Sequence, residues 1–348
     1  MSRSTPTIPE PHDKDGLLSL LGLLSPSMTA LDDFLHQQVE AFEPEVREIV
    51  SFCLARTGKR IRPLLLFLSG GEGSRVGDDL IRAAAVIEMV HLATLVHDDI
   101  LDEADLRHGV PTVSRRYGPQ TAVLLGDALF AQAVHLSTDF SDASVCRLVS
   151  AATRQVCSGE IAQTSRRGFT AISREFYFRL IQMKTAELFR VSCHLGAHLA
   201  GHRRDMVEGV ARFGNHLGIA YQIYDDLADF FAFEEKAGKT LGTDWASGKV
   251  TLPLILFLEQ LSPDERTDFI RQARQKEGLS FAETREMLEE RDIFDAVARE
   301  ILEHIRIAQQ ALLPFNGHAV PQGLRPLGNY LTEKVKSLRP ALPVSEVS

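Results

Sequence analysis

The chain has 348 residues, of which 44% are hydrophobic and 24% are charged, as in an ordinary globular enzyme. Its formal net charge of −9 argues against general nucleic-acid binding, because that binding needs a basic surface to displace the counterions of the phosphates. The four cysteines are widely spaced and form no C-x-x-C pair, which indicates a reduced protein and, by default, a cytoplasmic location. The leucine-rich stretch 17–24 is too short to cross a bilayer, so no transmembrane segment is expected.

We predict a flexible N-terminal arm over 1–25, an all-α domain over 26–338 and a C-terminal tail over 339–348. Within the domain, apolar residues recur at the three- and four-residue spacing of amphipathic helices, and turn residues separate the runs. No convincing series of strand-like alternations occurs, so the expected fold class is all-α, a single large helical bundle. The expected helices are 28–55, 62–70, 79–105, 119–137, 142–164, 173–200, 206–233, 251–260, 264–274, 283–291, 294–313 and 323–337.

Two acidic motifs with the same spacing lie in apolar helical surroundings. They comprise Asp98, Asp99 and Asp102 in the first motif, and Asp225, Asp226 and Asp229 in the second. Carboxylates so close together repel one another, whereas hard cations such as Mg2+ take oxygen ligands from one or two carboxylates and from substrate phosphates. One such motif alone would indicate a solvated acidic helix end. Two copies favour a metal site.

Cations and polar side chains accompany the acidic motifs. Gly58, Lys59 and Arg62 lie at a loop-to-helix junction, which suits a diphosphate, although a solvated basic turn is the simpler alternative. His91 lies seven residues before the first motif and shares its helical face, as either a core histidine or a substrate ligand. The remaining candidates are Arg107, Lys184, Thr185, Gln222, Lys239 and Lys249.

Together these features predict the kind of ligand. Six carboxylates facing one cavity would be unstable without cations, so they indicate a metal cluster. A metal cluster with lysines and arginines indicates a polyphosphorylated ligand, and apolar helices around it indicate that the rest of the ligand is hydrophobic. A diphosphate on a hydrocarbon tail meets all three demands.

With these motifs in this order, the chain resembles the trans-isoprenyl diphosphate synthases, also called polyprenyl synthetases. The resemblance runs from about Gly58 to Pro253 and rests on the Gly-Lys-Arg turn, both Asp-Asp-x-x-Asp motifs, Lys184-Thr185 and Gly-Lys-x-Thr-Leu-Pro. It implies a helical bundle around a central cavity, the isoprenoid synthase fold, and a homodimer. The implied reaction is the Mg2+-dependent, head-to-tail (1′-4) condensation of isopentenyl diphosphate with an allylic diphosphate.

The resemblance also implies roles for individual residues. The catalytic residues would be the six aspartates and Lys184. Three Mg2+ ions are implied, with principal ligands Asp98, Asp102 and Asp225 and supporting acids Asp99, Asp226 and Asp229. Isopentenyl diphosphate would be bound by Gly58, Lys59, Arg62, His91 and the residue at position 108. The allylic diphosphate would be bound by Arg107, Lys184, Thr185, Gln222 and Lys239, joined by Lys249.

One position departs from the family pattern. The family commonly has Arg-Arg-Gly after the first motif, whereas this chain has Arg107-His108-Gly109. Because histidine loses its charge near pH 6.5, we expect His108 to weaken the binding of isopentenyl diphosphate or to make that binding pH-dependent.

Product length follows from the residues just before the first motif. In the family, an aromatic side chain four or five positions before the first aspartate stops growth at C15. Here Ala93 and Thr94 occupy those positions, and Val90 lies deeper. We therefore predict an all-trans product of C20 or longer, preferably a quinone side-chain precursor of C30 to C50.

Three alternatives are open at this point. A terpene cyclase typically keeps one aspartate motif and does not need the Lys59, Arg62 and His91 set. A non-catalytic or regulatory subunit of a heteromeric synthase tends to lose aspartates, and this chain has lost none. A structural helical protein with acidic patches does not account for the cations that accompany the motifs.

Overall fold

The computed structural model describes residues 14–55, 58–71, 77–107, 109–166, 168, 172–232, 241–275 and 278–338. Nearly all regular structure in these ranges is helical. The single exception among them is an antiparallel hairpin of β1 (Leu106–Arg107) and β2 (Val110–Pro111), in which Leu106 pairs with Pro111. The predicted all-α class is therefore confirmed.

The chain divides into two compact units, and four helices contribute residues to both. Unit 1 consists of 1–154, 187–215 and 307–330, and unit 2 consists of 155–186, 216–306 and 331–348. The helices that contribute to both are α7 (Ala143–Thr164), α10 (Arg204–Phe231), α16 (Ile293–Ala311) and α17 (Ala319–Leu338). The first acidic motif belongs to unit 1 and the second to unit 2.

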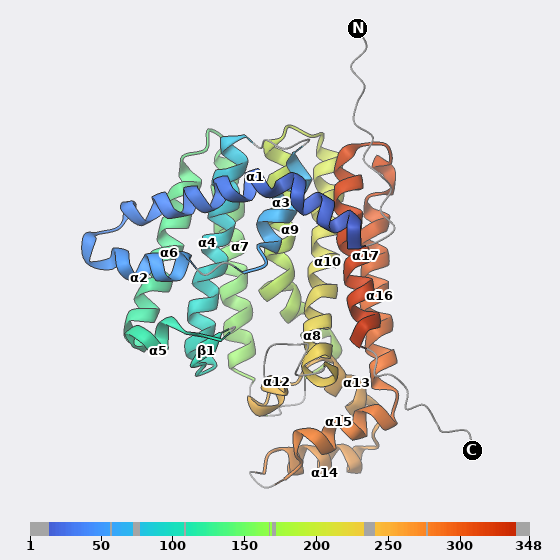
Figure 1. The fold of residues 1–348 in the computed structure, drawn as a ribbon. Helices are drawn as coiled ribbons and strands as arrows, with labels where there is room; N and C mark the ends of the chain where they lie inside the picture. The colour runs from blue at the N-terminus through green and yellow to red at the C-terminus, as the bar shows by residue number, and fades with distance from the viewer. Residues whose placement is uncertain are drawn as a thin grey trace. The chain divides into compact units, whose positions relative to one another are not determined.

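Unit 1 is built around α4 (Asp78–Leu101), which carries the first acidic motif. Helix α4 packs along α6 (Pro119–Thr138), and α1 (Lys14–Gln38) crosses over α4 and α3 (Ile61–Gly70) (Figure 1). The other elements of this unit are a 3-10 turn at Val39–Ala41, α2 (Pro44–Leu54), α5 (Val113–Tyr117), α9 (Glu187–Leu199), the 3-10 turn Leu313–Phe315, and part of α17 (Ala319–Leu338).

Helix α4 is apolar on nearly all sides because neighbouring helices cover it. Ala83 to Ile87 are fully buried, and Gly126 of α6 allows α6 to approach closely: a Cβ at Gly126 would lie 2.1 Å from Nε2 of His97. By length and mean hydropathy (1.5) α4 could cross a membrane, yet 67% of that window is buried inside the protein. The core helix of a globular protein meets the same criterion.

Unit 2 surrounds the second half of α10 and carries the second acidic motif. Its elements are the end of α7, α8 (Arg174–Ile181), a π-helical turn at Gln182–Ala186, α12 (Thr243–Ala246), α13 (Leu252–Gln260), α14 (Pro263–Ala273), α15 (Phe281–Glu290) and most of α16 (Ile293–Ala311). Aromatic rings fill its core, and the centroids of Phe257 and Phe269 lie 5.1 Å apart. Capping boxes at Ser262 and Ser280 fix the starts of α14 and α15.

The expected helices are found with small shifts at their ends, and two expectations need correction. Helix α1 begins at Lys14, so the arm predicted over 1–25 is helical from that residue, and Leu24 is buried. The helix predicted over 28–55 is interrupted before Pro44, which begins α2, because proline lacks the N–H that a continuing helix needs. The predicted tail at 339–348 lies outside the described residues.

Candidate active site

The first acidic motif sits where α4 ends. Asp98 is half-buried, Asp99 is buried and Asp102 is exposed, so the three carboxylates differ in their access to water. Asp102 is the C-cap residue, and its backbone N–H donates to the carbonyl of Asp98 at 2.8 Å. The helix therefore ends within the motif, and Asp102 follows its last turn.

Arg107 pairs with the buried aspartate of this motif. Its Nε donates to Oδ1 of Asp99 at 2.8 Å, and the Asp99 side chain is only 1% exposed. The β1–β2 hairpin holds Arg107, and Thr112 ties the end of that hairpin back by donating to the carbonyl of Ala104 at 2.7 Å. A buried carboxylate is costly without a charged partner, so Asp99 anchors Arg107.

The basic turn before α3 is fixed by Arg60, to which the sequence analysis assigned no role of its own. Gly58 and Lys59 are exposed, whereas Arg60 is buried and has a left-handed backbone with φ 47°. Arg60 forms ion pairs with Glu88 of α4 at 2.8 Å and with Asp32 of α1 at 3.1 Å. The charged run Lys59-Arg60 was visible in the sequence, but its division into one exposed and one buried cation was not.

His91 lies in an environment of positive charge. Its pKa is well below the ordinary value because it is removed from water and because Arg62, Arg107 and Arg60 repel a second positive charge. The imidazole is therefore neutral at pH 7. The guanidinium of Arg62 lies 5.2 Å from the centre of the Phe189 ring, a cation–π contact. This part of unit 1 can attract an anion and leaves His91 able to donate one N–H.

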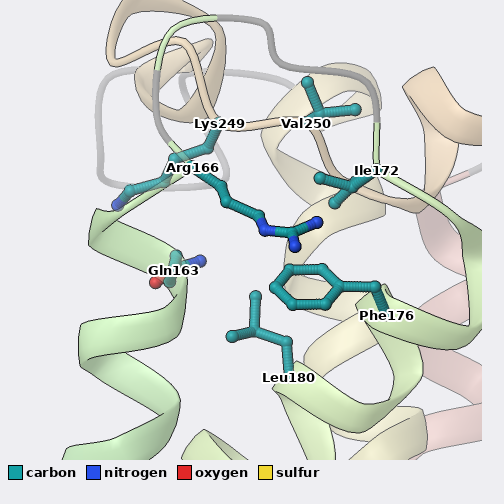
Figure 2. A pocket seen from close by; sticks show the side chains of 7 residues that line it. All are labelled: Gln163, Arg166, Ile172, Phe176, Leu180, Lys249 and Val250. Atoms are coloured by element: carbon teal, nitrogen blue, oxygen red, sulfur yellow. The ribbon is translucent and has the colours of Figure 1, made fainter.

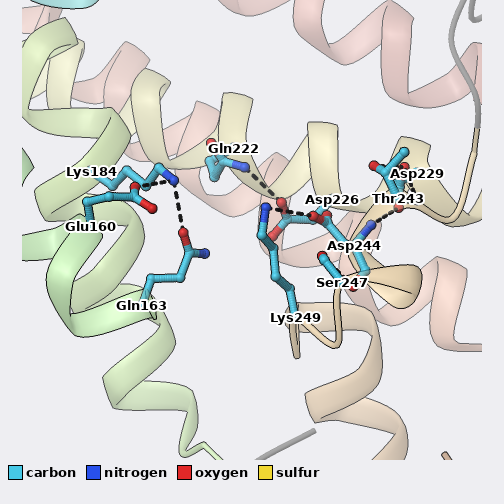
Figure 3. Close-up of polar contacts among 10 residues, drawn as sticks. All are labelled: Glu160, Gln163, Lys184, Gln222, Asp226, Asp229, Thr243, Asp244, Ser247 and Lys249. Atoms are coloured by element: carbon cyan, nitrogen blue, oxygen red, sulfur yellow. Dashed lines mark hydrogen bonds and ion pairs between the residues drawn. The ribbon is translucent and has the colours of Figure 1, made fainter. Parts of the chain in front are cut away.

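The second acidic motif lies on α10, and it also combines exposed and buried aspartates. Asp225 is exposed, whereas Asp226 and Asp229 are 3% and 2% exposed. Asp226 accepts hydrogen bonds at both oxygens. Gln222 Nε2 donates to Oδ1 at 2.8 Å (Figure 3). Tyr177 Oη donates to Oδ2 at 2.6 Å. Burial, and then the charges of Asp244 and Asp225, raise the pKa of Asp226 well above its usual range.

Asp229 caps the short helix α12. Its carboxylate accepts from the backbone N–H of Thr243 at 3.3 Å, from the Thr243 hydroxyl at 3.1 Å, and from the backbone N–H of Asp244 at 3.1 Å (Figure 3). A carboxylate satisfies the N–H groups at the start of a helix and is favoured there by the helix dipole. Asp229 therefore holds the segment that leads to Lys249, whose Nζ lies 3.9 Å from Asp244 Oδ1.

Lys184 and Thr185 lie in the π-helical turn that follows α8. The ammonium of Lys184 forms an ion pair with Glu160 and donates to Gln163 Oε1 at 2.9 Å (Figure 3). The hydroxyl of Thr185 donates to Gln222 Oε1 at 2.7 Å. Glu160 and Gln163 of α7 were missed from the sequence, where only their place in a helix was apparent.

A shallow pocket of about 300 Å³, part of it open to solvent, adjoins these residues. It is lined by Gln163, Arg166, Ile172, Phe176, Leu180, Lys249 and Val250 (Figure 2). The guanidinium of Arg166 covers the Phe176 ring at 4.1 Å from its centre. Arg166 and Lys249, together with the apolar side chains of the lining, give unit 2 an amphipathic surface.

The donor set of the accessible aspartates fits a hard divalent cation. In the described part of the chain, no three acidic, histidine or cysteine side chains are gathered in a way that would hold a metal ion by themselves. Mg2+ usually keeps several waters and is bound by one or two carboxylates together with substrate phosphates. Asp98, Asp102 and Asp225 can supply such carboxylates, because they are half-buried or exposed, whereas the other three aspartates of the two motifs are buried.

The remaining predicted site residues separate into two groups. Val90 and Ala93 are buried within unit 1, and Thr94 is half-buried with its hydroxyl donating to the carbonyl of His91 at 2.6 Å. His108 and Lys239 lie outside the described residues, so their roles stay predictions.

Comparison with known proteins identifies relatives of this chain. A family model described as polyprenyl synthetase matches residues 43–290. The chain is 35% identical to "Heptaprenyl diphosphate synthase component 2" of Bacillus subtilis (strain 168), over 68% of each chain. It is 32% identical to "Octaprenyl diphosphate synthase" of Escherichia coli (strain K12), over 70% of this chain and 75% of that one.

Solved structures give the same result at the level of the fold. A decaprenyl diphosphate synthase from Rhodobacter capsulatus superposes with a TM-score of 0.82 at 28% identity, covering 91% of this chain and 98% of that one. A polyprenyl synthase from Caulobacter crescentus CB15, complexed with calcium and isoprenyl diphosphate, also has a TM-score of 0.82 at 28% identity, covering 92% and 99%. The matching family model, the relatives and the two acidic motifs agree. The chain therefore belongs to the polyprenyl synthetase family and is an enzyme of the polyprenyl diphosphate synthase class.

Proposed function

We propose that the protein is a Mg2+-dependent trans-prenyltransferase that condenses isopentenyl diphosphate with an allylic diphosphate, head to tail (1′-4). The observation that carries this proposal is that each acidic motif combines accessible and buried carboxylates. Asp98, Asp102 and Asp225 are accessible and suited to a metal–diphosphate complex. Asp99, Asp226 and Asp229 are buried, and they bind Arg107, Gln222 and the start of α12, respectively. The calcium and isoprenyl diphosphate named for the Caulobacter crescentus structure support the same ligand class.

The reaction needs no side-chain nucleophile. The allylic C–O bond breaks and its electron pair leaves with the diphosphate, producing an allylic carbocation. The double bond of isopentenyl diphosphate then forms the new C–C bond, and transfer of a proton to the released diphosphate restores an allylic diphosphate one C5 unit longer. Bound Mg2+, with Asp98, Asp102 and Asp225 as its proposed ligands and three ions proposed per site, would take up negative charge on the leaving diphosphate.

The cations of this chain have a complementary task. Lys184, Lys249 and Arg107 are proposed to hold the allylic diphosphate and to stabilise the negative charge that develops on it as the C–O bond breaks. Lys59, Arg62 and neutral His91 are proposed to hold the diphosphate of isopentenyl diphosphate. The low pKa of His91 supports a hydrogen-bonding role, because a neutral imidazole donates an N–H without adding charge.

We propose a long-chain all-trans product, of C20 or more and preferably C30 to C50. Ala93 is small and buried, and no aromatic side chain replaces it or Thr94. The names of the relatives, which include heptaprenyl and octaprenyl diphosphate synthases, support a product in this range. Incubation with Mg2+, isopentenyl diphosphate and allylic primers of several lengths, followed by mass spectrometry of the products, tests both the reaction and the product length.

A second candidate function is a subunit of a heteromeric synthase, and the name "component 2" of the Bacillus subtilis relative favours it. We propose instead that the protein acts as a homodimer, and that it is located in the cytoplasm. Two large apolar side chains on α6, Val123 and Leu124, are 43% and 68% exposed, which suits burial against a second copy. Light scattering of the purified chain, together with elongation by that chain alone, distinguishes the two. A monomer that makes no product with any primer would favour the heteromer.

A further inference from the structure

Tyr177 is a buried residue that no motif of the sequence singled out. It lies on α8, is 2% exposed, and its ring packs edge-on against Phe178 with centroids 5.5 Å apart. Its hydroxyl donates to Oδ2 of Asp226 at 2.6 Å. A buried tyrosine hydroxyl needs a partner, and here that partner is the middle carboxylate of the second acidic motif.

The bond from Tyr177 is one end of a chain of hydrogen bonds. Gln222 donates to the other oxygen of Asp226 at 2.8 Å, and Thr185 donates to Gln222 at 2.7 Å. Gln222 and Asp226 are four residues apart on α10, so they follow one another along one face of that helix. Both oxygens of Asp226 are thereby engaged, which fixes the orientation of its carboxylate.

One end of this chain of hydrogen bonds lies before a backbone irregularity, and the other end lies within it. Tyr177 belongs to α8, and Thr185 belongs to the π-helical turn that follows it. A π-helical turn is rare and occurs frequently at functional sites. The hydrogen bonds therefore hold that turn against α10 and fix the position of Lys184, which lies in the turn and contacts Glu160.

We propose that Tyr177 is a positioning residue that acts through Asp226. By fixing the orientation of that carboxylate, Tyr177 keeps the π-helical turn in place against α10. Asp225 and Lys184 are thereby positioned for a metal–diphosphate complex. Tyr177 itself does not touch the substrate. The inference rests on the proposed function, because it concerns residues assigned to the diphosphate and its Mg2+.

The test uses Tyr177→Phe in the full chain, which removes one hydroxyl and keeps the ring. Tyr117→Phe is the matched control, because it removes a hydroxyl that donates to exposed Glu48 at 3.1 Å in unit 1. Affinity for Mg2+ with inorganic pyrophosphate is measured from the rise in unfolding temperature that the two ligands cause. We expect the apparent Kd of Tyr177→Phe to rise on the order of tenfold, since Asp226 loses one of the two hydrogen bonds that orient its carboxyl group.

Kinetics supply the second measurement. The KM for isopentenyl diphosphate should be unchanged, whereas kcat should fall and the Mg2+ requirement should rise, a separation that general loss of packing would not give. All variants are compared at a temperature at which circular dichroism shows them to be folded. The variant Asp226→Asn, alone and combined with Tyr177→Phe, completes a double-mutant cycle, in which the two effects should not add.

Two results would overturn the role of Tyr177: a pyrophosphate affinity and a kcat equal to those of the wild type, or fully additive effects with Asp226→Asn. These differ from failure of the proposed function. In that case the wild type itself would elongate no primer and would gain no stability from Mg2+ with pyrophosphate.

Discussion

The carboxylate of Asp99, 1% exposed, is held by the Nε of Arg107 at a distance of 2.8 Å across the turn that ends α4. Removal of the cation takes an ion pair away from a buried acid. We expect Arg107→Leu to lower the free energy of unfolding by about 1–3 kcal/mol. Urea unfolding measures this change. The double variant Arg107→Leu/Asp99→Asn should recover part of the loss, and a double variant less stable than Arg107→Leu would contradict the assignment.

Arg60 should matter more than its exposed neighbour Lys59 for stability. Because its side chain and that of Glu88 are 6% and 4% exposed, Arg60→Ala leaves an unpaired buried carboxylate and should destabilise the fold by roughly 3–5 kcal/mol. Arg47→Ala is the control, since it removes an ion pair with Glu40 that is exposed on both sides. A loss no larger than that of the control, in thermal or urea unfolding, would show that the buried pair does not hold the turn.

A pair of stacked histidines predicts how stability depends on pH. Burial lowers the pKa of His304, while the charge of Glu303 opposes this shift. The ring of His304 contacts His216, with 3.0 Å between the Nδ1 atoms and 5.2 Å between the ring centroids. The pKa of His304 is lower in the folded protein than in the unfolded chain. Its contribution to the free energy of unfolding is therefore fully present above about pH 6.5, and it is lost as the pH falls through the folded pKa.

Replacement of His304 by phenylalanine keeps an aromatic ring next to Phe178, with which His304 now stacks at 5.6 Å. The variant should lose less unfolding free energy than the wild type between pH 7 and pH 5, as measured by urea unfolding at each pH. An identical pH profile for the two proteins would rule out this pair as a source of acid sensitivity.

Product length should respond to a ring at position 93. Ala93 is fully buried on α4, so Ala93→Phe is expected to obstruct growth of the hydrocarbon and to give a shorter main product. Mass spectrometry of the products with one primer measures the change, and Ala131→Phe, at an exposed position of α6, is the control. Products of wild-type length from Ala93→Phe would show that the chain does not grow along this helix.

Position 108 offers a test of substrate affinity. We expect His108→Arg to lower the KM for isopentenyl diphosphate, because arginine binds diphosphate through a charge that does not titrate near neutral pH. Steady-state kinetics at pH 6 and pH 8 should show a smaller pH dependence in the variant. A KM that is unchanged or raised would count against the assignment.

Much of this arrangement could be predicted from the sequence because it depends on local patterns. Apolar spacing and turn residues predicted most of the helices, and the repeated aspartate spacing identified both acidic motifs. Tyr177 and Glu160 could not be found in this way, since each meets its partner only through packing of distant segments. The π-helical turn at Lys184 was also hidden, because one extra residue in a turn hardly alters the apolar periodicity of a long helix.

Asp229 belongs to the acidic motif by its spacing, yet it serves as the N-terminal cap of α12, fourteen residues farther along the chain. Substitution of the three aspartates one at a time would therefore not compare three equivalent ligands. Loss of activity at Asp229 would reflect displacement of the α12 segment and of Lys249, whose backbone N–H donates to the Asp244 carbonyl at 2.8 Å. In this enzyme an acidic motif that we propose to bind metal also sets the path of the chain beside it.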